Sequence, residues 1–420
     1  MSPTTLYKIY LYYLRFMGVS CHSNNKYTEN LLIFYNLIFI ILDVKLVYDF
    51  SSRASEDTAD INVIQNIMVF VNLALVMAFK IVRIFIACRV IIRRKLEAYI
   101  FKLFEEIEDD FQLKLFHNFE FSNCYKIIFY RYFCLVEILS NSIALIYKWY
   151  YASFFSLFNY FRFILTLQAI RAVYLQFVLI IIKIDENLEN LEKCLKINLH
   201  EKQQQQPQSH QQQHQQKKDK QQTVGHPAEM NVFNNQCVLY NIDCSVDSDG
   251  SISVVRHYLL QRIWTMKCIY GKIIQISLIC SSLFGLSVLL TNFLCICELT
   301  EIMYVAVTAL AYHSFDLREV LHGLHMVLPM VIILLTMCSL SNKCSKRVIA
   351  IAKQLKTSSL PAFYIDDFIM QILQNPIKFS AYNFYDLNLS TIFKIFILVF
   401  DSMVIFLQLF ALTQLGEEKK

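Results

Sequence analysis

Long apolar stretches separated by polar segments dominate the chain. Seven of them are long enough to cross a bilayer core of about 30 Å, which requires about 20 helical residues. They cover residues 31–50, 62–87, 126–147, 160–184, 270–294, 323–341 and 390–412. A further apolar segment, 295–312, contains Glu298 and Glu301, and we interpret it as interfacial. The pattern predicts an all-α, multi-pass membrane protein with seven transmembrane helices.

Lys and Arg are distributed unevenly among the segments between these helices. If the N-terminus is inside, the inner segments hold 25 of these residues and the outer segments hold 5. Because cytoplasmic loops carry the excess of Lys and Arg, the N-terminus is predicted to lie inside and the C-terminus outside. This orientation is opposite to that of a G-protein-coupled receptor, which also has seven spans.

The predicted organisation alternates membrane and cytoplasmic parts. Residues 31–184 form helices one to four, and residues 270–341 form helices five and six. Between them lies a cytoplasmic loop, 185–269, in which residues 203–222 include 12 glutamines and are predicted to be disordered. The other parts are a cytoplasmic N-terminus at 1–30, a cytoplasmic helical anchor at 342–389, the last transmembrane helix at 390–412 and an extracellular tail at 413–420.

Composition excludes several classes of function. Apolar residues make up 56% of the chain and charged residues 17%, and the net charge of +5 is too small to indicate a nucleic-acid partner. No GxGxxG, Walker, GxSxG or HExxH motif occurs, and the 13 cysteines form no pair of CxxC motifs. The sequence therefore predicts no enzymatic activity, no cofactor and no metal site.

Some polar side chains lie within the predicted spans, where they are costly and usually face protein or water. Glu137 of the third span and Arg171 of the fourth lie near the same depth and are predicted to form an interhelical ion pair, either as a brace or as part of a ligand site. A mostly apolar pocket for a small organic ligand is expected in the outer half of the first six helices. The candidate ligand-binding residues, chosen by depth, are Gln65, Asn66, Asn141, Arg162, Asn292 and His325.

The last predicted helix carries a polar stripe. Lys394, Asp401 and Gln408 are seven residues apart, so they lie on one side of a helix that is otherwise apolar. Such a stripe must face water or a polar partner. An aqueous pore shared between subunits is one interpretation, and separate hydrogen bonds to neighbouring helices are the other.

The sequence around this helix resembles that of the insect gustatory receptors. The family pattern is Thr-Tyr, five apolar residues and Gln-Phe, and the run Asp401-Ser402-Met403-Val404-Ile405-Phe406-Leu407-Gln408-Leu409 matches it in spacing, in the five apolar residues and in Gln408. Asp401, Ser402 and Leu409 replace Thr, Tyr and Phe. The preceding run from Lys378 to Asn388 resembles the Phe-Ser-Ala segment that precedes the helix in the family.

The resemblance implies a function that the composition alone does not give. It implies a subunit of a homo- or heterotetrameric, ligand-gated cation channel in the plasma membrane of a sensory neuron, surrounded by lipid and opened by a small-molecule tastant. Lys394, Asp401 and Gln408 would then line the pore, and the cytoplasmic helical parts would form a shared anchor.

Two other classes of seven-helix protein remain as alternatives. A G-protein-coupled-type receptor is disfavoured by the charge distribution and by the lack of an Asp-Arg-Tyr motif after the third span. A transporter is disfavoured because the spans contain few Gly or Pro breaks at mid-depth.

Overall fold

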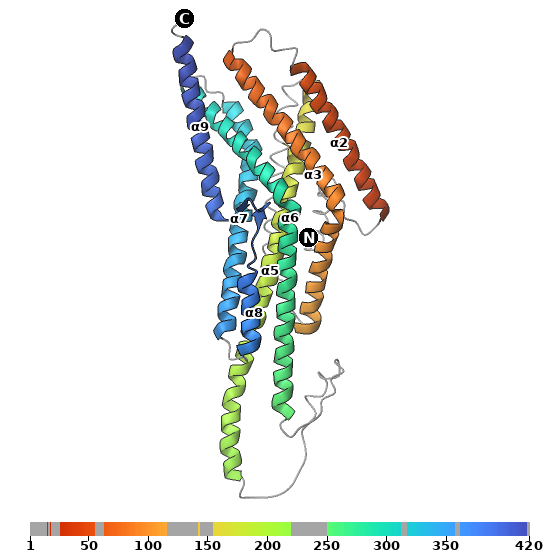
Figure 1. Cartoon of the computed structure of the whole chain (residues 1–420), viewed down its shortest axis with the longest axis vertical. Coiled ribbons are helices and arrows are strands. Elements are labelled where there is room, and N and C mark those ends of the chain that lie inside the picture. Colours follow the sequence, from red (N-terminus) through yellow and green to blue (C-terminus); the bar gives the residue numbers. More distant parts are fainter. Residues whose placement is uncertain are drawn as a thin grey trace.

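The computed structural model describes residues 15, 17, 26–54, 63–115, 142, 154–219, 250–311, 317–357 and 362–417. Long helices run roughly along one axis (Figure 1). They are α2 (Lys26–Ala54), α3 (Val63–Asp110) with the π-helical turn η1 (Phe111–Leu115), α5 (Phe154–Asp219), α6 (Gly250–Ala311), α7 (Leu317–Thr357), α8 (Ala362–Gln374) and α9 (Leu389–Glu417). The predicted third span, 126–147, lies outside the described residues apart from residue 142.

Several helices are too long to be membrane spans alone. At 1.5 Å per residue, the 66 residues of α5 and the 62 of α6 extend over roughly 90–100 Å, about three times the thickness of a bilayer core. Among the described residues, four helices contain segments long and apolar enough to span a membrane, namely Tyr27–Lys45, Ile164–Lys196, Leu260–Tyr304 and Val327–Thr357. The long helices must therefore continue beyond the membrane.

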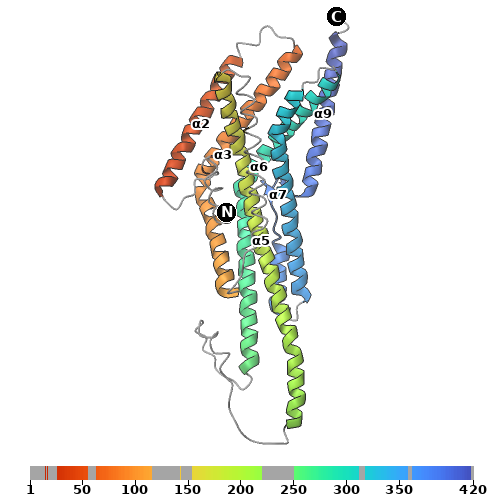
Figure 2. The ribbon, with the colours of Figure 1, turned by 180° about the vertical axis from the view of Figure 1, so that it is seen from behind.

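Two antiparallel strands divide the molecule into two halves. β1 (Ser380–Ala381) and β2 (Tyr385–Asp386) form a hairpin directly before α9. We call the half that contains α9 the membrane half. The anchor half comprises α8 and the parts of α3, α5, α6 and α7 beside it, on the opposite side of the hairpin (Figures 1 and 2).

The anchor half is held by an apolar core with ion pairs around it. Its fully buried side chains come from every helix of this half, and they include Ile107, Leu188, Ile273, Ile351 and Phe368. Between α5 and α7, the carboxylate of Asp185 forms ion pairs with Lys343 and Arg347, and its oxygens lie 2.8 Å from Lys343 Nζ and Arg347 Nε. Between α6 and α3, Lys272 Nζ lies 2.9 Å from the Asp110 carboxylate. The sequence predicted a helical anchor at 342–389, and the structure has α7, α8 and the hairpin there.

The glutamine-rich tract follows the end of the packed part of α5. Disorder is predicted at 203–222 and stays a prediction, and α5 continues as a helix through Asp219. Glutamine and lysine are good helix formers, and adding residues to an existing helix avoids the unfavourable nucleation step.

The hairpin is a tight turn that α6 approaches very closely. Tyr382 and Asn383 both have positive φ angles (55° and 59°), and Phe384 N donates to Ala381 O at 3.0 Å. These are the features of a type I′ turn. A Cβ on Gly285 of α6 would lie 2.4 Å from the backbone nitrogen of Tyr382, so only glycine fits at this contact.

This contact shows how α6 is placed relative to α9 and bears on the predicted fifth span. We expected residues 270–294 to cross the membrane and 295–312 to be interfacial. Gly285 instead lies level with the hairpin, just before the start of α9, and α6 continues without a break to Ala311. The part of α6 that runs beside α9 therefore begins near Gly285. Many of the apolar residues before it, such as Ile273, Ile276 and Leu283, are buried by other parts of the protein, which a hydropathy pattern cannot distinguish from burial in lipid.

The close approach predicts a strong effect of one added methyl group. Gly285→Ala should destabilise the protein by about 1–3 kcal/mol, because the new Cβ must displace backbone atoms of the hairpin. Gly271→Ala on the same helix is a matched control, since its Cβ would meet only the end of the flexible Gln371 side chain, at 3.3 Å. The measurement is the thermal unfolding midpoint in detergent. Equal midpoints for the two variants would contradict the packing described here.

Candidate functional site

A buried charge cluster lies between three helices of the membrane half. Asp43 is near the middle of α2, and its two carboxylate oxygens accept Lys80 Nζ at 3.2 Å and Arg83 Nη1 at 3.1 Å, both from α3. Lys80 Nζ also donates to Thr166 Oγ1 of α5 at 2.6 Å. The Asp43 and Lys80 side chains are each only 3% exposed. One carboxylate thus connects α2 to α3, and one ammonium connects α3 to α5.

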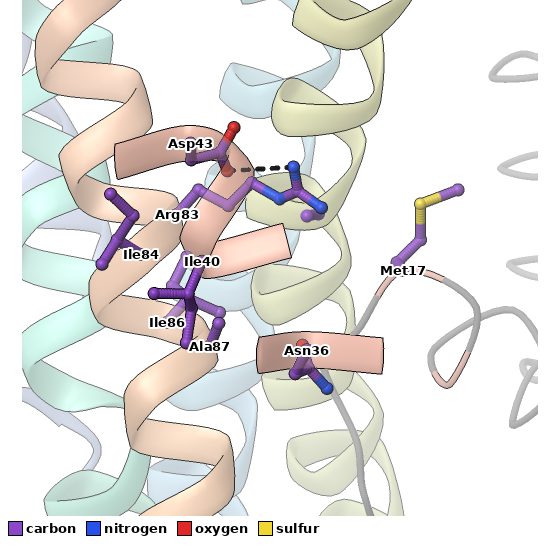
Figure 3. A pocket seen from close by; sticks show the side chains of 9 residues that line it. Met17, Asn36, Ile40, Asp43, Arg83, Ile84, Ile86 and Ala87 are labelled. Carbon is purple, nitrogen blue, oxygen red and sulfur yellow. Dashed lines mark hydrogen bonds and ion pairs between the residues drawn. The ribbon is translucent and has the colours of Figure 1, made fainter. Parts of the chain in front are cut away.

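A small cavity adjoins this cluster (Figure 3). Asp43 and Arg83 line its polar side, and the apolar residues Met17, Ile84, Ile86 and Ala87 line much of the rest. Its volume of about 10 Å³ is close to the minimum for one water molecule. An organic tastant does not fit into it in this conformation.

The sequence prediction missed this cluster, although a signal was present. Asp43 lies inside the predicted span 31–50, and Lys80 and Arg83 lie inside the predicted span 62–87. Opposite charges in neighbouring spans are expected to pair, because unpaired charges at membrane depth are costly. The same reasoning was applied only to Glu137 and Arg171.

Asn292 of α6 forms hydrogen bonds near the start of α9. The sequence predicts it at the outer end of the fifth span, in a ligand pocket, and this stays a prediction. In the structure its side chain lies between Tyr174 of α5 and Tyr385 of β2, with hydrogen bonds to both hydroxyls. Tyr385 is four residues before α9, so Asn292 lies close to where α9 begins.

The polar stripe of α9 is exposed along its length. Lys394, Asp401 and Gln408 are all exposed, whereas Ile392, Val399 and Met403 are buried. At 100° per residue, the buried residues lie about 160° around the helix from the polar stripe. Helix α9 therefore packs on its own subunit by one edge and turns the polar stripe away from it.

The start of α9 is fixed by an N-cap. Asn388 Oδ1 accepts the backbone N–H of Thr391 at 3.0 Å, and the Thr391 hydroxyl donates to the backbone oxygen of Asp386 at 2.6 Å. This pattern satisfies an N–H group of the first turn that has no partner within the helix. Rotation of α9 is thereby coupled to the hairpin.

The structure leaves the other predicted site residues untested. Glu137 and Asn141 lie outside the described residues, and Arg171 is fully buried on α5. The backbone positions of the remaining four are described but their side chains are not, with Gln65 and Asn66 on α3, Arg162 on α5 and His325 on α7.

Comparison with known proteins agrees with this architecture. A family model described as "7tm Chemosensory receptor" matches residues 7–409. A Drosophila melanogaster protein named putative gustatory receptor 9a is 27% identical over 175 residues, which is 40% of this chain and about half (51%) of that protein.

The fold is similar to that of a solved insect receptor. The olfactory receptor OR5 from Machilis hrabei, in complex with eugenol, superposes with a TM-score of 0.61 over 97% of this chain and 98% of its own, at 12% identity. The structure of the same receptor described without eugenol superposes with the same TM-score, at 11% identity. Such low identity establishes a shared fold and no more.

The predicted seven-span pattern and the extended helices agree with a family match that covers nearly the whole chain, and the conclusion is that the chain belongs to the 7tm chemosensory receptor family.

Proposed function

We propose that this chain is a subunit of a tetrameric, ligand-gated cation channel in the plasma membrane, which opens in response to a small-molecule tastant. The observation that carries the proposal is the exposure of Lys394, Asp401 and Gln408 on the side of α9 opposite to its packed edge. A polar stripe on a transmembrane helix is stable only against water or polar groups. Four copies of α9 around an axis would supply a water-filled path for it.

Charge along the stripe supports permeation by cations. Asp401 would form a ring of carboxylates near mid-depth, which favours cations over anions. Gln408 would form a neutral amide ring nearer the outer end. Lys394 lies close to the capped start of α9, and its positive charge would oppose the entry of cations into the pore. A wide pore mouth at this level, or partner subunits without this lysine, would reduce the repulsion.

The polar groups of the other helices are proposed to form a tastant pocket and a brace between helices. We propose that Gln65, Asn66, Asn141, Arg162 and His325 contribute to the tastant pocket and that Asn292 does not, because its amide is occupied by Tyr174 and Tyr385. The Asp43 cluster is proposed as a brace that holds α2 to α3 and α5. Its charged groups bind one another, and the adjoining cavity holds no more than a water molecule.

The first prediction of this proposal concerns the pore. Asp401→Asn should lower single-channel cation conductance by up to about tenfold and shift the reversal potential toward that of anions, since a charged constriction concentrates counter-ions about tenfold or more. Asp366→Asn is the matched control, because Asp366 is an exposed carboxylate on α8, away from the stripe. Recordings from the expressed protein, with co-subunits where needed, provide the test. Equal conductance in all three proteins would exclude Asp401 from the pore.

Orientation gives a second prediction, which separates this proposal from a G-protein-coupled-type receptor. An epitope tag at the C-terminus should be accessible to antibody in intact cells, and a tag at the N-terminus only after permeabilisation, because the excess of Lys and Arg retains the N-terminal side in the cytoplasm. The reverse pattern would support the alternative receptor class.

A third prediction tests the brace. Asp43→Asn should destabilise the membrane half by about 3–5 kcal/mol, because it leaves Lys80 and Arg83 buried without their carboxylate. The yield of monodisperse protein in size-exclusion chromatography should fall, and the charge exchange Asp43→Lys with Lys80→Asp should recover part of it. A normal yield combined with loss of tastant response would assign Asp43 to ligand binding instead.

A further inference from the structure

Helix α3 bends at the boundary between the two halves. Arg93 has non-helical backbone angles (φ −101°, ψ 15°), which separate two straighter parts of α3. Its Nη1 donates to the backbone oxygen of Ser282 on α6 at 2.6 Å. Ser282 is three residues before Gly285, which contacts the hairpin just before α9. Arg93 therefore lies at the level where the last helix starts its passage through the membrane.

A second arginine lies one turn away and faces the same small cavity. Arg89 Nη1 donates to Ser287 Oγ at 2.7 Å, and its guanidinium lies over the Phe284 ring, 4.8 Å from the centroid. Arg89 is more than nine-tenths buried, and its Nε has no hydrogen-bond partner in the described part of the chain. Both arginines line a cavity of about 10 Å³ between α3, α5 and α6.

This lining carries excess positive charge. Within the described ranges, neither Arg89 nor Arg93 forms an ion pair with a carboxylate. Glu97 also lines the cavity and interacts electrostatically with Arg89, and its carboxylate accepts a hydrogen bond from Gln176 Nε2 at 2.7 Å. The cavity therefore has two guanidinium groups against one carboxylate, in a region where an uncompensated charge is unfavourable.

The outer surface next to Arg93 is apolar. Ile92 and Leu96 of α3 are 77% and 37% exposed, and Leu278 of α6 is 63% exposed. Leu96 and Leu278 lie on the anchor side of the hairpin level, and on the membrane side Ile81 of α3 and Phe293 of α6 are 56% and 63% exposed, where they are suited to contact acyl chains. Arg93 is thus half-buried between α3 and α6, and we call the surface between these exposed side chains the groove.

We infer that this groove binds the headgroup of an anionic membrane phospholipid, with the phosphate on Arg93 and the acyl chains along the membrane half. Charge complementarity supports this occupant, since guanidinium groups bind phosphate oxygens through paired N–H donors. Basic pockets between helices at the inner leaflet, where anionic lipids gather, are suited to such headgroups. The cavity is too small for a phosphate, so the headgroup lies at its outer side while Arg89 adds positive charge from within. The inference requires a chain embedded in the membrane, but not that α9 lines a pore.

The test uses the full-length protein purified in mild detergent, with phosphatidylserine and phosphatidylcholine of identical acyl chains as probes. Native mass spectrometry counts the lipids retained. The wild type should retain phosphatidylserine over phosphatidylcholine, and Arg93→Gln should weaken phosphatidylserine binding about tenfold, as expected for loss of one charge-assisted contact. Arg93→Lys should recover part of the binding, which separates loss of charge from misfolding.

Lys95→Gln is the matched control, because Lys95 is an exposed cation two residues from Arg93 whose replacement changes the net charge equally. It should retain phosphatidylserine like the wild type. Equal retention in the wild type and Arg93→Gln would overturn the inference, as would release of the lipid by inorganic phosphate at equal concentration. If Arg93→Gln instead dissociates an oligomer and leaves lipid retention unchanged, the groove is a contact between subunits and the inference is also wrong.

Discussion

The close approach of α6 to the β1–β2 hairpin is the constraint on which the rest of the architecture depends. Gly285 allows the helix backbone to contact the turn at Tyr382 directly. Around this contact, Phe177 of α5 stacks on Phe284 of α6 with ring centroids 5.4 Å apart, and the Phe379 ring, directly before β1, packs edge-on against Phe177 with centroids 6.0 Å apart. Three segments far apart in sequence therefore meet at one level, and this level separates the membrane half from the anchor half.

The same junction connects the anchor half to the proposed pore. The hairpin leads into α9 through the Asn388 cap, and Asn292 joins the hairpin to α6 and α5 through Tyr385 and Tyr174. A change in how α5 and α6 pack in the membrane half would therefore reach the start of α9 without passing through a flexible linker. Proteins of this class must transmit ligand binding to a gate, and a rigid junction beside the last helix is a physically suitable route.

Charges have different partners in the two halves. In the anchor half, carboxylates and cations form a network between helices, as Asp185 does with Lys343 and Arg347. In the membrane half, Asp43 forms ion pairs with both Lys80 and Arg83. Because these groups are buried, removing the Asp43 carboxylate costs more free energy of folding than removing one partner of an exposed ion pair. At the junction, Arg89 and Arg93 have serine and aromatic partners, and we infer that an anionic lipid headgroup binds beside them.

The sequence by itself determined the helical class, the membrane residence and the polar stripe of α9, because these follow from local composition and from helical periodicity. The family resemblance of the last helix was also visible in the spacing of Asp401 and Gln408. Tertiary structure decided which part of α6 runs beside α9, since residues 270–284 are equally apolar whether lipid or protein buries them. It also placed Asn292 beside Tyr385 and paired Asp43 with Lys80 and Arg83. These contacts depend on which helices are neighbours and on the level at which they meet. A hydropathy pattern along one chain contains no information on either.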